Sequence, residues 1–369
     1  MWERASSEFR RTLRFVVVTW VLARIVSRCA EVFCPPGCVA ALRPAIPEMI
    51  NPGMVTPIKV TKSMAASSRS RREAGSSGHP AQGAQRAMPA GPLLEVSVGN
   101  DHSCALKTGG NLVCFGSNKN GQCDVPADLA PLLAVSAGGG HTCGIKKDGH
   151  LVCFGLNNYG QCNVPVDLGP VLEVAAGHDH TCAVRAEGHL VCFGNTGSGQ
   201  CDVPADFGPV LAISAGLSHT CVVGVSFQLV CFGHQFGRKA SCPRHVPADL
   251  GPVLAVSTGA THTCAVGRDA RLVCFGCWND SPTACDVPAN LGPVLSVAVG
   301  EDYTCAVRSD AQLVCFGSNP LGASDAPADL GPVSAVYAGV FYTCAVRKDG
   351  QLVCFGDNSA GQCNVPTIW

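Results

Sequence analysis

Apolar and polar positions are arranged in a short pattern that recurs from residue 92 onward. Each unit opens with an apolar, β-branched run, VLAVSA in its averaged form, and a glycine follows that run. Two further runs, typified by HTCAV and LVCFG, are separated by a short turn. Runs of this length and composition, bounded by glycine, proline and turn residues, predict short β-strands rather than helices.

This recurrence divides the chain into seven units, five of which are 38 or 39 residues long. Three to four antiparallel strands per unit, repeated seven times, predict an all-β fold: a seven-bladed β-propeller built from repeats of ~39 residues. The fourth and fifth units are longer, with extra residues near 234–245 and 277–285. The expected repeats are 92–130, 131–169, 170–208, 209–251, 252–292, 293–331 and 332–369.

The turn between the second and third runs usually contains glycine. Lys348-Asp349-Gly350 is typical, because Asp-Gly favours a hairpin and glycine accepts a positive φ without a Cβ clash. Ala270 and Ala311 replace this glycine in two units, and the fourth unit has Val225-Ser226-Phe227. If these positions also need a positive φ, each replacement costs on the order of 1 kcal/mol.

The first 91 residues lack the repeated pattern. In residues 1–38, four arginines precede a short apolar run, Phe15 to Ala23, which is shorter than the about 20 residues that span a membrane. A basic start before such a run is typical of a secretory signal; an organellar transit peptide or an uncleaved tail are the alternatives. Residues 39–91 are rich in Ala, Ser, Pro, Gly and Arg, which predicts a disordered linker.

Composition constrains the compartment and the partner. The 24 cysteines favour an oxidising compartment or a metal protein. We therefore expect a secreted or extracytoplasmic protein, with an organellar or cytoplasmic location as the alternative. Residues 1–91 hold 13 Lys and Arg against 5 Asp and Glu, whereas the repeats hold 13 against 22. Since an acidic body repels phosphate backbones, we expect no nucleic-acid partner. We also expect no membrane span, because the apolar run is too short.

Two cysteines, separated by nine residues, recur in all seven units. With a three-residue turn, Cys344 faces Cys354 across the hairpin, close enough for a modest adjustment to form a disulfide. A two-residue turn would instead set Cys344 against Phe355. We expect seven disulfides, with reduced cysteines in small core sites as the alternative. The candidate pairs are Cys104/Cys114, Cys143/Cys153, Cys182/Cys192, Cys221/Cys231, Cys264/Cys274, Cys305/Cys315 and Cys344/Cys354.

A third cysteine position is less regular. We expect its cysteines to fill small apolar sites, with a bridge between Cys277 and Cys285 as an alternative for that one pair. The sixth unit has Ser324 in this place. The other units have Cys123, Cys162, Cys201, Cys242, Cys285 and Cys363.

Cysteine near histidine raises the question of zinc. Five units carry a histidine two residues before a paired cysteine, but structural zinc sites favour cysteines two to four residues apart. We therefore expect buried histidines bonded to neighbouring backbone, with no metal and no cofactor. No phosphate loop, G-x-S-x-G or paired-carboxylate motif occurs, so we predict no catalytic residues and no enzyme activity. The residues concerned are His102, His141, His180, His219 and His262, with Tyr303 and Tyr342 in the equivalent places.

The averaged segment AGxxHTCAVxxDGxLVCFGxNxxGQ resembles the repeats of the regulator of chromosome condensation family. The matching features are the glycine after the first strand, H-T or H-S, the D-G turn, an aromatic-Gly pair and G-Q, and they recur over 92–369. The trailing VPADLGPVLAVSAG is also similar to propellers of the β-lactamase inhibitory protein type. The resemblance implies a seven-bladed propeller, although every unit has Phe where the family usually has Trp.

Members of that family serve as guanine-nucleotide exchange factors, partner-binding domains of ubiquitin ligases, secreted inhibitors and receptor ectodomains. We predict a non-catalytic, monomeric propeller that binds a protein partner whose identity the sequence does not specify; a small-GTPase regulator and a substrate-binding component of a ubiquitin ligase are the alternatives. Partner contacts are expected in two loops that vary between units, one before the His or Tyr and one after C-F-G. The candidates are Tyr159, Phe236, Trp278, Phe341 and Tyr342.

Overall fold

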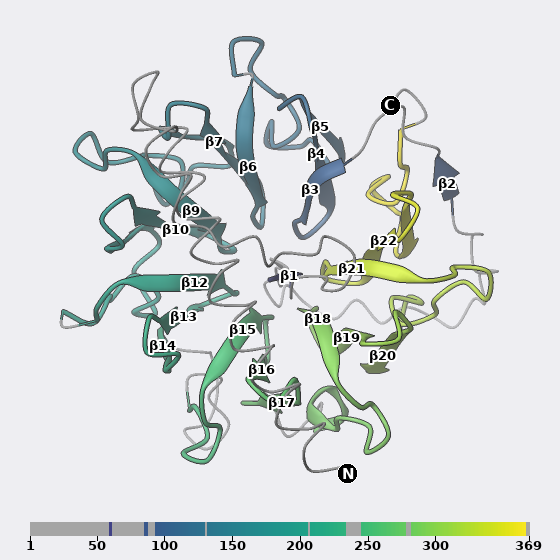
Figure 1. Ribbon diagram of the computed structural model, residues 1–369. Helices are drawn as coiled ribbons and strands as arrows, with labels where there is room; N and C mark the ends of the chain where they lie inside the picture. The colour runs from purple at the N-terminus through teal and green to yellow at the C-terminus, as the bar shows by residue number, and fades with distance from the viewer. Residues whose placement is uncertain are drawn as a thin grey trace, which may run out of the picture.

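Seven β-sheets stand around a central axis in the computed structural model (Figure 1). The structure describes residues 59–60, 85–87, 93–129, 131–205, 207–233, 245–277 and 282–366. Each repeat contributes three antiparallel strands to one sheet, and the chain passes from sheet to sheet around the ring. The predicted all-β, seven-bladed propeller is confirmed.

The three strands of each blade correspond to the three apolar runs of its repeat. The first strand lies nearest the axis: β3 (Leu93–Val98), β6 (Leu132–Ala137), β9 (Val171–Ala176), β12 (Val210–Ala215), β15 (Val253–Thr258), β18 (Val294–Val299) and β21 (Val333–Ala338). The middle strands are β4 (His102–Lys107), β7 (His141–Lys146), β10 (His180–Arg185), β13 (His219–Gly224), β16 (Thr263–Gly267), β19 (Tyr303–Arg308) and β22 (Tyr342–Arg347). The outer strands are β5 (Leu112–Gly116), β8 (Leu151–Gly155), β11 (Leu190–Gly194), β14 (Leu229–Gly233), β17 (Leu272–Phe275), β20 (Leu313–Gly317) and β23 (Leu352–Gly356).

The turn between middle and outer strands has the register expected from the sequence. In the last blade Val346 pairs with Leu352 and Cys344 with Cys354. The turn position has a positive φ in all three repeats that lack glycine there: 63° at Ala270, 68° at Ala311 and 66° at Phe227. The expected backbone strain is therefore present at these three residues.

Ala270→Gly and Ala311→Gly are each expected to raise the free energy of unfolding by about 1 kcal/mol, because glycine adopts this φ without a Cβ clash. Denaturant unfolding measures the change. Gly350→Ala is the matched control: its φ is 88° and a Cβ there would meet nothing within 4 Å, so it should lose a similar amount through φ alone. If all three variants have the same free energy of unfolding as the unmodified chain, the positive φ carries no energetic cost.

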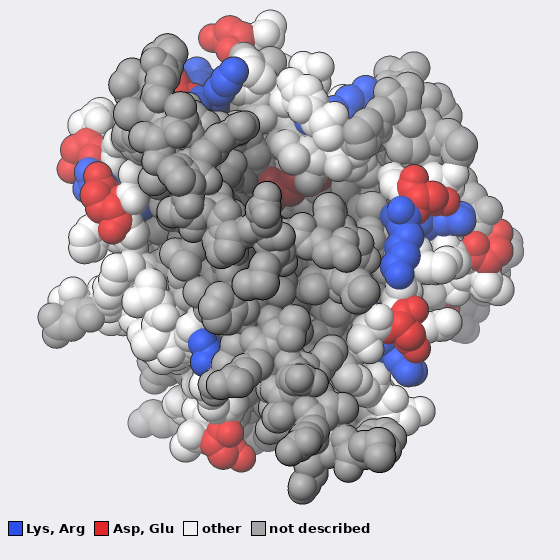
Figure 2. All heavy atoms as spheres, viewed as in Figure 1, with Lys and Arg blue, Asp and Glu red and all other residues white. Residues whose placement is uncertain are grey.

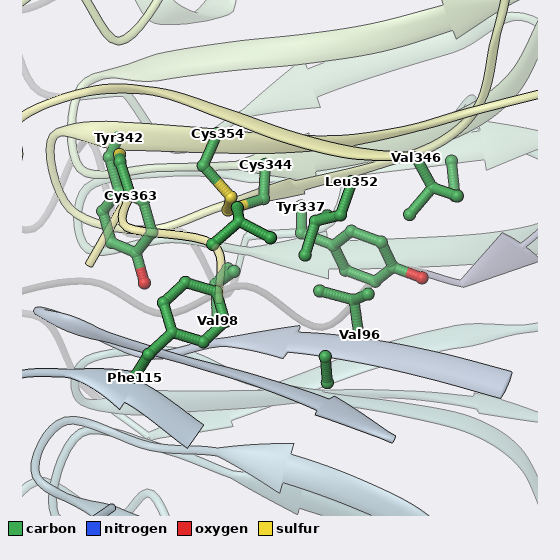
Figure 3. Packing of buried hydrophobic residues seen from close by; sticks show 13 residues of the cluster. Val96, Val98, Phe115, Tyr337, Tyr342, Cys344, Val346, Leu352, Cys354 and Cys363 are labelled. Atoms are coloured by element: carbon green, nitrogen blue, oxygen red, sulfur yellow. A yellow bond between two sulfur atoms is a disulfide. The ribbon is translucent and has the colours of Figure 1, made fainter. Parts of the chain in front are cut away.

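The hydrophobic core lies between blades rather than within them. Each of seven buried clusters joins side chains from two consecutive blades, including one cluster that joins the last blade to the first. In Figure 3, Val96, Val98 and Phe115 of the first blade face Tyr337 and the Cys344–Cys354 disulfide of the last. Burial between neighbours makes the closed ring, rather than the single blade, the stable unit.

Two short strands from the segment before the repeats join the ring. β1 (Lys59–Val60) lies near the axis and pairs in parallel with β18, and β2 (Gln85–Ala87) pairs antiparallel with β23 at the outer edge. Both fall within 39–91, for which the sequence predicts a disordered linker. The rest of that segment and residues 1–38 lie outside the described residues, so the linker and the signal-like segment stay predictions.

Helical structure is nearly absent from the described part of the chain, where the one helical element is the 3-10 turn Pro282–Cys285. No helix there has the length and apolar character needed to cross a membrane.

Candidate binding surface and the ring beneath it

The paired cysteines of every blade are joined across the hairpin. The structure contains Cys104–Cys114, Cys143–Cys153, Cys182–Cys192, Cys221–Cys231, Cys264–Cys274, Cys305–Cys315 and Cys344–Cys354. The first cysteine of each pair is fully buried. An eighth disulfide joins Cys277 to Cys285, as the alternative for that pair suggested. Sulfur atoms bonded in this way are neither nucleophiles nor metal ligands.

The third cysteine is a free thiol in four repeats, at Cys123, Cys162, Cys201 and Cys363. Each thiol donates to the carbonyl six residues earlier, as Cys162 Sγ does to Leu156 O at 3.3 Å. Burial raises the pKa of Cys162 to about 11, which keeps it in the unreactive thiol form. These cysteines therefore close the loop after the outer strand as well as filling space. Cys242 lies outside the described residues.

Five buried histidines form a ring of contacts between blades. The Nε2 atom of each bonds to the Thr hydroxyl of the next blade, as in the 2.9 Å contact from His141 to Thr181. Thr181 Oγ1 in turn donates to Gln161 O at 2.8 Å. Since a hydroxyl has one proton to donate, Thr181 must accept from His141, which fixes the Nε2–H tautomer. The predicted buried histidines are present, but the partners of their Nε2 atoms are hydroxyl side chains rather than backbone.

The ring histidines are neutral at ordinary pH. Burial lowers the pKa of His141, His180 and His262 to about 3 and that of His102 and His219 to about 4. The Nδ1 atoms of the first four in sequence have no hydrogen-bond partner in the structure, so protonation there would place an uncompensated charge in the core.

Tyr303 and Tyr342 continue the ring where histidine is missing. Their longer side chains reach the backbone of the next blade: Tyr303 donates to Tyr342 O at 2.5 Å, and Tyr342 donates to His102 O at 2.7 Å. Ser103 replaces the usual threonine and donates to Tyr342 Oη at 3.1 Å. The contact from the last blade to the first thus has the same form as the contact from Tyr303 to the seventh blade.

The glycine after each first strand makes room for this ring. A Cβ on Gly216 would lie 2.8 Å from His219 Cε1 and 2.5 Å from Gly259 O of the next blade, both far below ordinary contact distance. The sequence marks this glycine as the end of a strand. Its structural role is close packing of the ring side chain and of the neighbouring backbone.

The two loops that vary between repeats meet on one end of the propeller, which we call the variable face. The residue after the outer strand donates to the carbonyl of the loop before the middle strand, as Leu156 N does to Gly140 O at 2.8 Å. Blades one, two, three, six and seven all have this bond. In the other two, the second loop contains residues 234–244 and 278–281, which lie outside the described residues.

Tyr159 and Leu321 stand out on the variable face because they are apolar and half exposed, at 56% and 50%. Both occupy the same position, directly before the glycine of the loop after the outer strand, in repeats two and six. The equivalent residues elsewhere are small or polar: Asn120, Ser198 and Ala360. Sequence reasoning named Tyr159 and missed Leu321, although alignment of the repeats places them in one column.

The other partner candidates have different surroundings. Phe341 is half-buried, and its carbonyl accepts from Asp357 N at 2.8 Å on the variable face. Tyr342 is fully buried in the ring, so the structure does not offer it to a partner. It was predicted as a surface contact because it is an apolar side chain next to a variable loop, whereas it is the first residue of β22 and points inward. Phe236 and Trp278 lie outside the described residues.

Carboxylates gather on the variable face across the sixth, seventh and first blades. Burial, with the nearby Asp302 charge, raises the pKa of Glu301 to about 7. Burial and then the charge of Asp357 raise the pKa of Asp101. The described residues contain no group of three or more His, Cys, Asp or Glu side chains arranged to hold a metal ion.

Charge is dispersed elsewhere. On the face drawn in Figure 2, the described charged side chains lie mostly toward the rim, and both signs are present. Hairpin turns carry local pairs such as Arg308–Asp310 at 3.0 Å and Arg347–Asp349 at 3.1 Å, which stabilise a protein surface by at most about 1 kcal/mol each.

The repeats match a known family model. The regulator of chromosome condensation (RCC1) repeat model matches residues 95–122, 133–161, 171–200 and 333–362, in the first, second, third and seventh blades. Four of the seven blades are therefore regulator of chromosome condensation repeats. The remaining three blades have the same three-stranded form, although the fourth and fifth carry longer loops and the sixth has Ser324. No curated protein matches the sequence.

Solved structures with a similar fold include plant receptor ectodomains. The ectodomain of the receptor kinase CR4 from Physcomitrella patens is 23% identical with a TM-score of 0.59, covering 72% of this chain and 74% of that one. The CRINKLY WD40 ectodomain of ACR4 from Arabidopsis thaliana is 23% identical with a TM-score of 0.57, covering 72% and 98%. Prp20p from Saccharomyces cerevisiae is 16% identical with a TM-score of 0.55, covering 72% and 82%.

Identities this low support the propeller fold and do not transfer a partner. The exchange-factor and ubiquitin-ligase alternatives therefore gain no residue-level support. The similarity to β-lactamase inhibitory proteins is supported by neither the family model nor these structures, and it stays a prediction.

Proposed function

We propose that the chain is a non-catalytic protein-binding propeller whose partner docks on the variable face. The observation that carries this proposal is the exposure of Tyr159 and Leu321 at one equivalent position, on the end where the two variable loops meet in blades one, two, three, six and seven. Exposed aromatic and aliphatic side chains are common anchors of protein interfaces, and Tyr in particular combines an apolar ring with a polar tip.

The interior of the propeller repeats from blade to blade, whereas the loops of the variable face do not. Disulfides, the His–Thr contacts and the cores between blades repeat with little change, which is what a rigid scaffold requires. The loops of the variable face differ in charge, size and polarity from blade to blade, as for Gly139 and Gly140 against Glu301 and Asp302. Binding specificity commonly lies in loops held by such a scaffold.

We further propose an extracytoplasmic location. Eight disulfides in the described residues are typical of an oxidising compartment, since cytosolic thiols are kept reduced. The similar structures named above include two receptor ectodomains, which is consistent with such a location.

Tyr159→Ala combined with Leu321→Ser is expected to weaken capture of the partner at least tenfold, because both lost side chains would contribute apolar contact area on the variable face. The measurement is affinity capture from the native source with quantitative mass spectrometry, run with and without reductant.

Val225→Ser is the matched control for this test. Val225 is 52% exposed but lies in a hairpin turn at the opposite end of the propeller, so its loss should leave capture unchanged. Proteins that are lost equally from both variants are nonspecific. If the double variant retains every protein that the unmodified chain captures, the variable face is not the docking surface.

A further inference from the structure

Two short strands fix both ends of the segment 61–84. β1 pairs in parallel with β18, and β18 ends at the loop before β19, which lies on the variable face. The chain therefore leaves β1 in the direction of the variable face. β2 pairs antiparallel with β23, which ends at the loop 357–360 on the same face, so β2 begins at Gln85 near that face. Both ends of the segment thus lie toward one end of the propeller.

The direct route between these two ends crosses the variable face. β1 lies near the axis beside the sixth blade, and β2 lies at the outer rim of the seventh (Figure 1). Neighbouring strands are about 4.8 Å apart, so the three strands of one blade separate the axis from the rim by about 15 Å. Extended chain spans about 3.3 Å per residue, which makes the segment 61–84 several times longer than this gap. The segment therefore has the length to follow the surface of the sixth, seventh and first blades.

Carboxylates lie along this route. Glu301 N and Asp357 N each donate to a carbonyl of the loop 340–341, at 3.4 Å and 2.8 Å, so Glu301 and Asp357 flank the same loop of the seventh blade. Asp302 follows Glu301 in the sixth blade. Asp101 of the first blade is near enough to Asp357 for that charge, after burial, to raise its pKa. We call these four residues, Asp101, Glu301, Asp302 and Asp357, the acidic sector.

The acidic sector has little basic charge on its own face. In the described loops of the variable face, Lys119 is the one lysine or arginine. Glu301 Oε2 is buried and has no hydrogen-bond partner among the described residues, and the charge of Asp302 lies close to it. Like charges held together favour a ligand of the opposite charge, because such a ligand stabilises their ionised forms.

The segment 61–84 carries that opposite charge. It contains Lys62 and three arginines, at 69, 71 and 72, against a single acidic residue, Glu73. Arginine in particular binds carboxylates through two parallel N–H bonds. We propose that the acidic sector is the docking site of this chain's own segment 61–84, with the arginines of SRSRR bound to the carboxylates. The proposal goes beyond the proposed function, because the occupant belongs to the chain itself and not to a partner.

The test measures binding of a fluorescent peptide of residues 61–84 to the full-length chain. In the variant Arg69→Gln/Arg71→Gln/Arg72→Gln, the chain's own segment loses these charges and should release the acidic sector. This variant should bind the peptide at least tenfold more tightly than the unmodified chain, in which the tethered segment competes at an effective concentration on the order of millimolar. Equal binding by both proteins, including no binding by either, would overturn the proposal.

Two sets of substitutions, each added to the arginine variant, locate the site. Changing the acidic sector to amides should abolish peptide binding. The matched control removes the same number of negative charges from hairpin turns at the opposite end of the propeller and should leave binding intact. If both sets abolish binding, or neither does, the acidic sector is not the site. The first set is Asp101→Asn/Glu301→Gln/Asp302→Asn/Asp357→Asn, and the control set is Asp148→Asn/Glu187→Gln/Asp310→Asn/Asp349→Asn.

Salt provides a measurement that does not depend on the folding of these two sets. Binding of the peptide to the arginine variant should weaken at least tenfold from about 50 mM to about 500 mM NaCl, because salt screens exposed charges. Binding that does not change with salt would contradict the proposal. No partner protein takes part in this assay, so a negative result does not bear on the proposed function.

Discussion

Replacing both cysteines of the Cys182–Cys192 disulfide with alanine is expected to lower the free energy of unfolding by about 3 kcal/mol. The bond closes a loop with a sequence separation of 10, for which the chain-entropy model gives about 2.5–3 kcal/mol. Alanine is the appropriate replacement because Cys182 is fully buried, so a serine hydroxyl there would need a partner. Seven such bonds together contribute more than the 5–15 kcal/mol by which a folded protein is typically stable. Complete reduction should therefore unfold the propeller without denaturant.

A double-mutant cycle separates the bond from simple packing. With a disulfide present, either single alanine variant loses the whole bond and the second substitution adds little, whereas reduced cysteines would give additive losses. Cys201→Ala is the control, since this free thiol contributes only a weak hydrogen bond to Asn195 O and should cost less than about 1 kcal/mol. Additive single losses at Cys182 and Cys192 would show that the pair acts as filler.

Acidification from pH 6.5 to pH 4 is expected to destabilise the propeller more than any single substitution. Burial holds the pKa of the five ring histidines at about 3 to 4, below the 6.5 of an unfolded chain. Below pH 6.5 the unfolded state therefore binds protons that the folded state excludes. Stability present above pH 6.5 is lost as the pH falls, by about 1.4 kcal/mol per unit for each histidine.

The five contributions together reach on the order of 10 kcal/mol at pH 5, comparable with the whole stability of a domain. Glu301 and Asp101 act in the opposite direction, because their raised pKa values mean that the folded state binds protons more readily on acidification, but they are two groups that are not fully buried. Thermal unfolding recorded at intervals between pH 7.5 and pH 4 measures the slope. A midpoint that does not change over this range would contradict the neutral ring.

His180→Tyr tests the origin of this pH dependence. The chain already uses tyrosine at Tyr303 and Tyr342, where the hydroxyl donates to the backbone of the next blade, so the variant should fold. Removing one of five titrating groups should reduce the loss of stability on acidification by about one fifth. An unchanged slope would assign the acid sensitivity to other groups.

The sequence predicted the parts of the fold that depend on local chemistry repeated many times. Seven copies of the same three runs define the blades, and Asp-Gly at the hairpin sets the register that brings Cys344 to Cys354. Strain at Ala270 and Ala311 followed from the same comparison, because glycine in the other repeats marks a position with positive φ.

Other features depend on contacts between blades, which carry no local signature. The partner of His141 is Thr181, 40 residues away, and nothing near either residue identifies the pair. Strands β1 and β2 span two and three residues, too short for any apolar period, and exist only because other strands leave an edge to pair with. Tyr159 and Tyr342 both lie in or beside variable segments, but the side chain of Tyr159 is exposed and that of Tyr342 is buried. The sequence alone does not distinguish these two orientations.

The contact between Tyr342 and the first blade means that the ring has no distinguished starting blade. Each blade offers a ring side chain forward and a hydroxyl backward: Ser103 contacts Tyr342 of the last blade, as Thr142 contacts His102 of the first. The order of blades in the sequence is therefore a property of the covalent chain and not of the packing. A rearranged chain that keeps all seven repeats in cyclic order would preserve every contact of the ring, wherever it began.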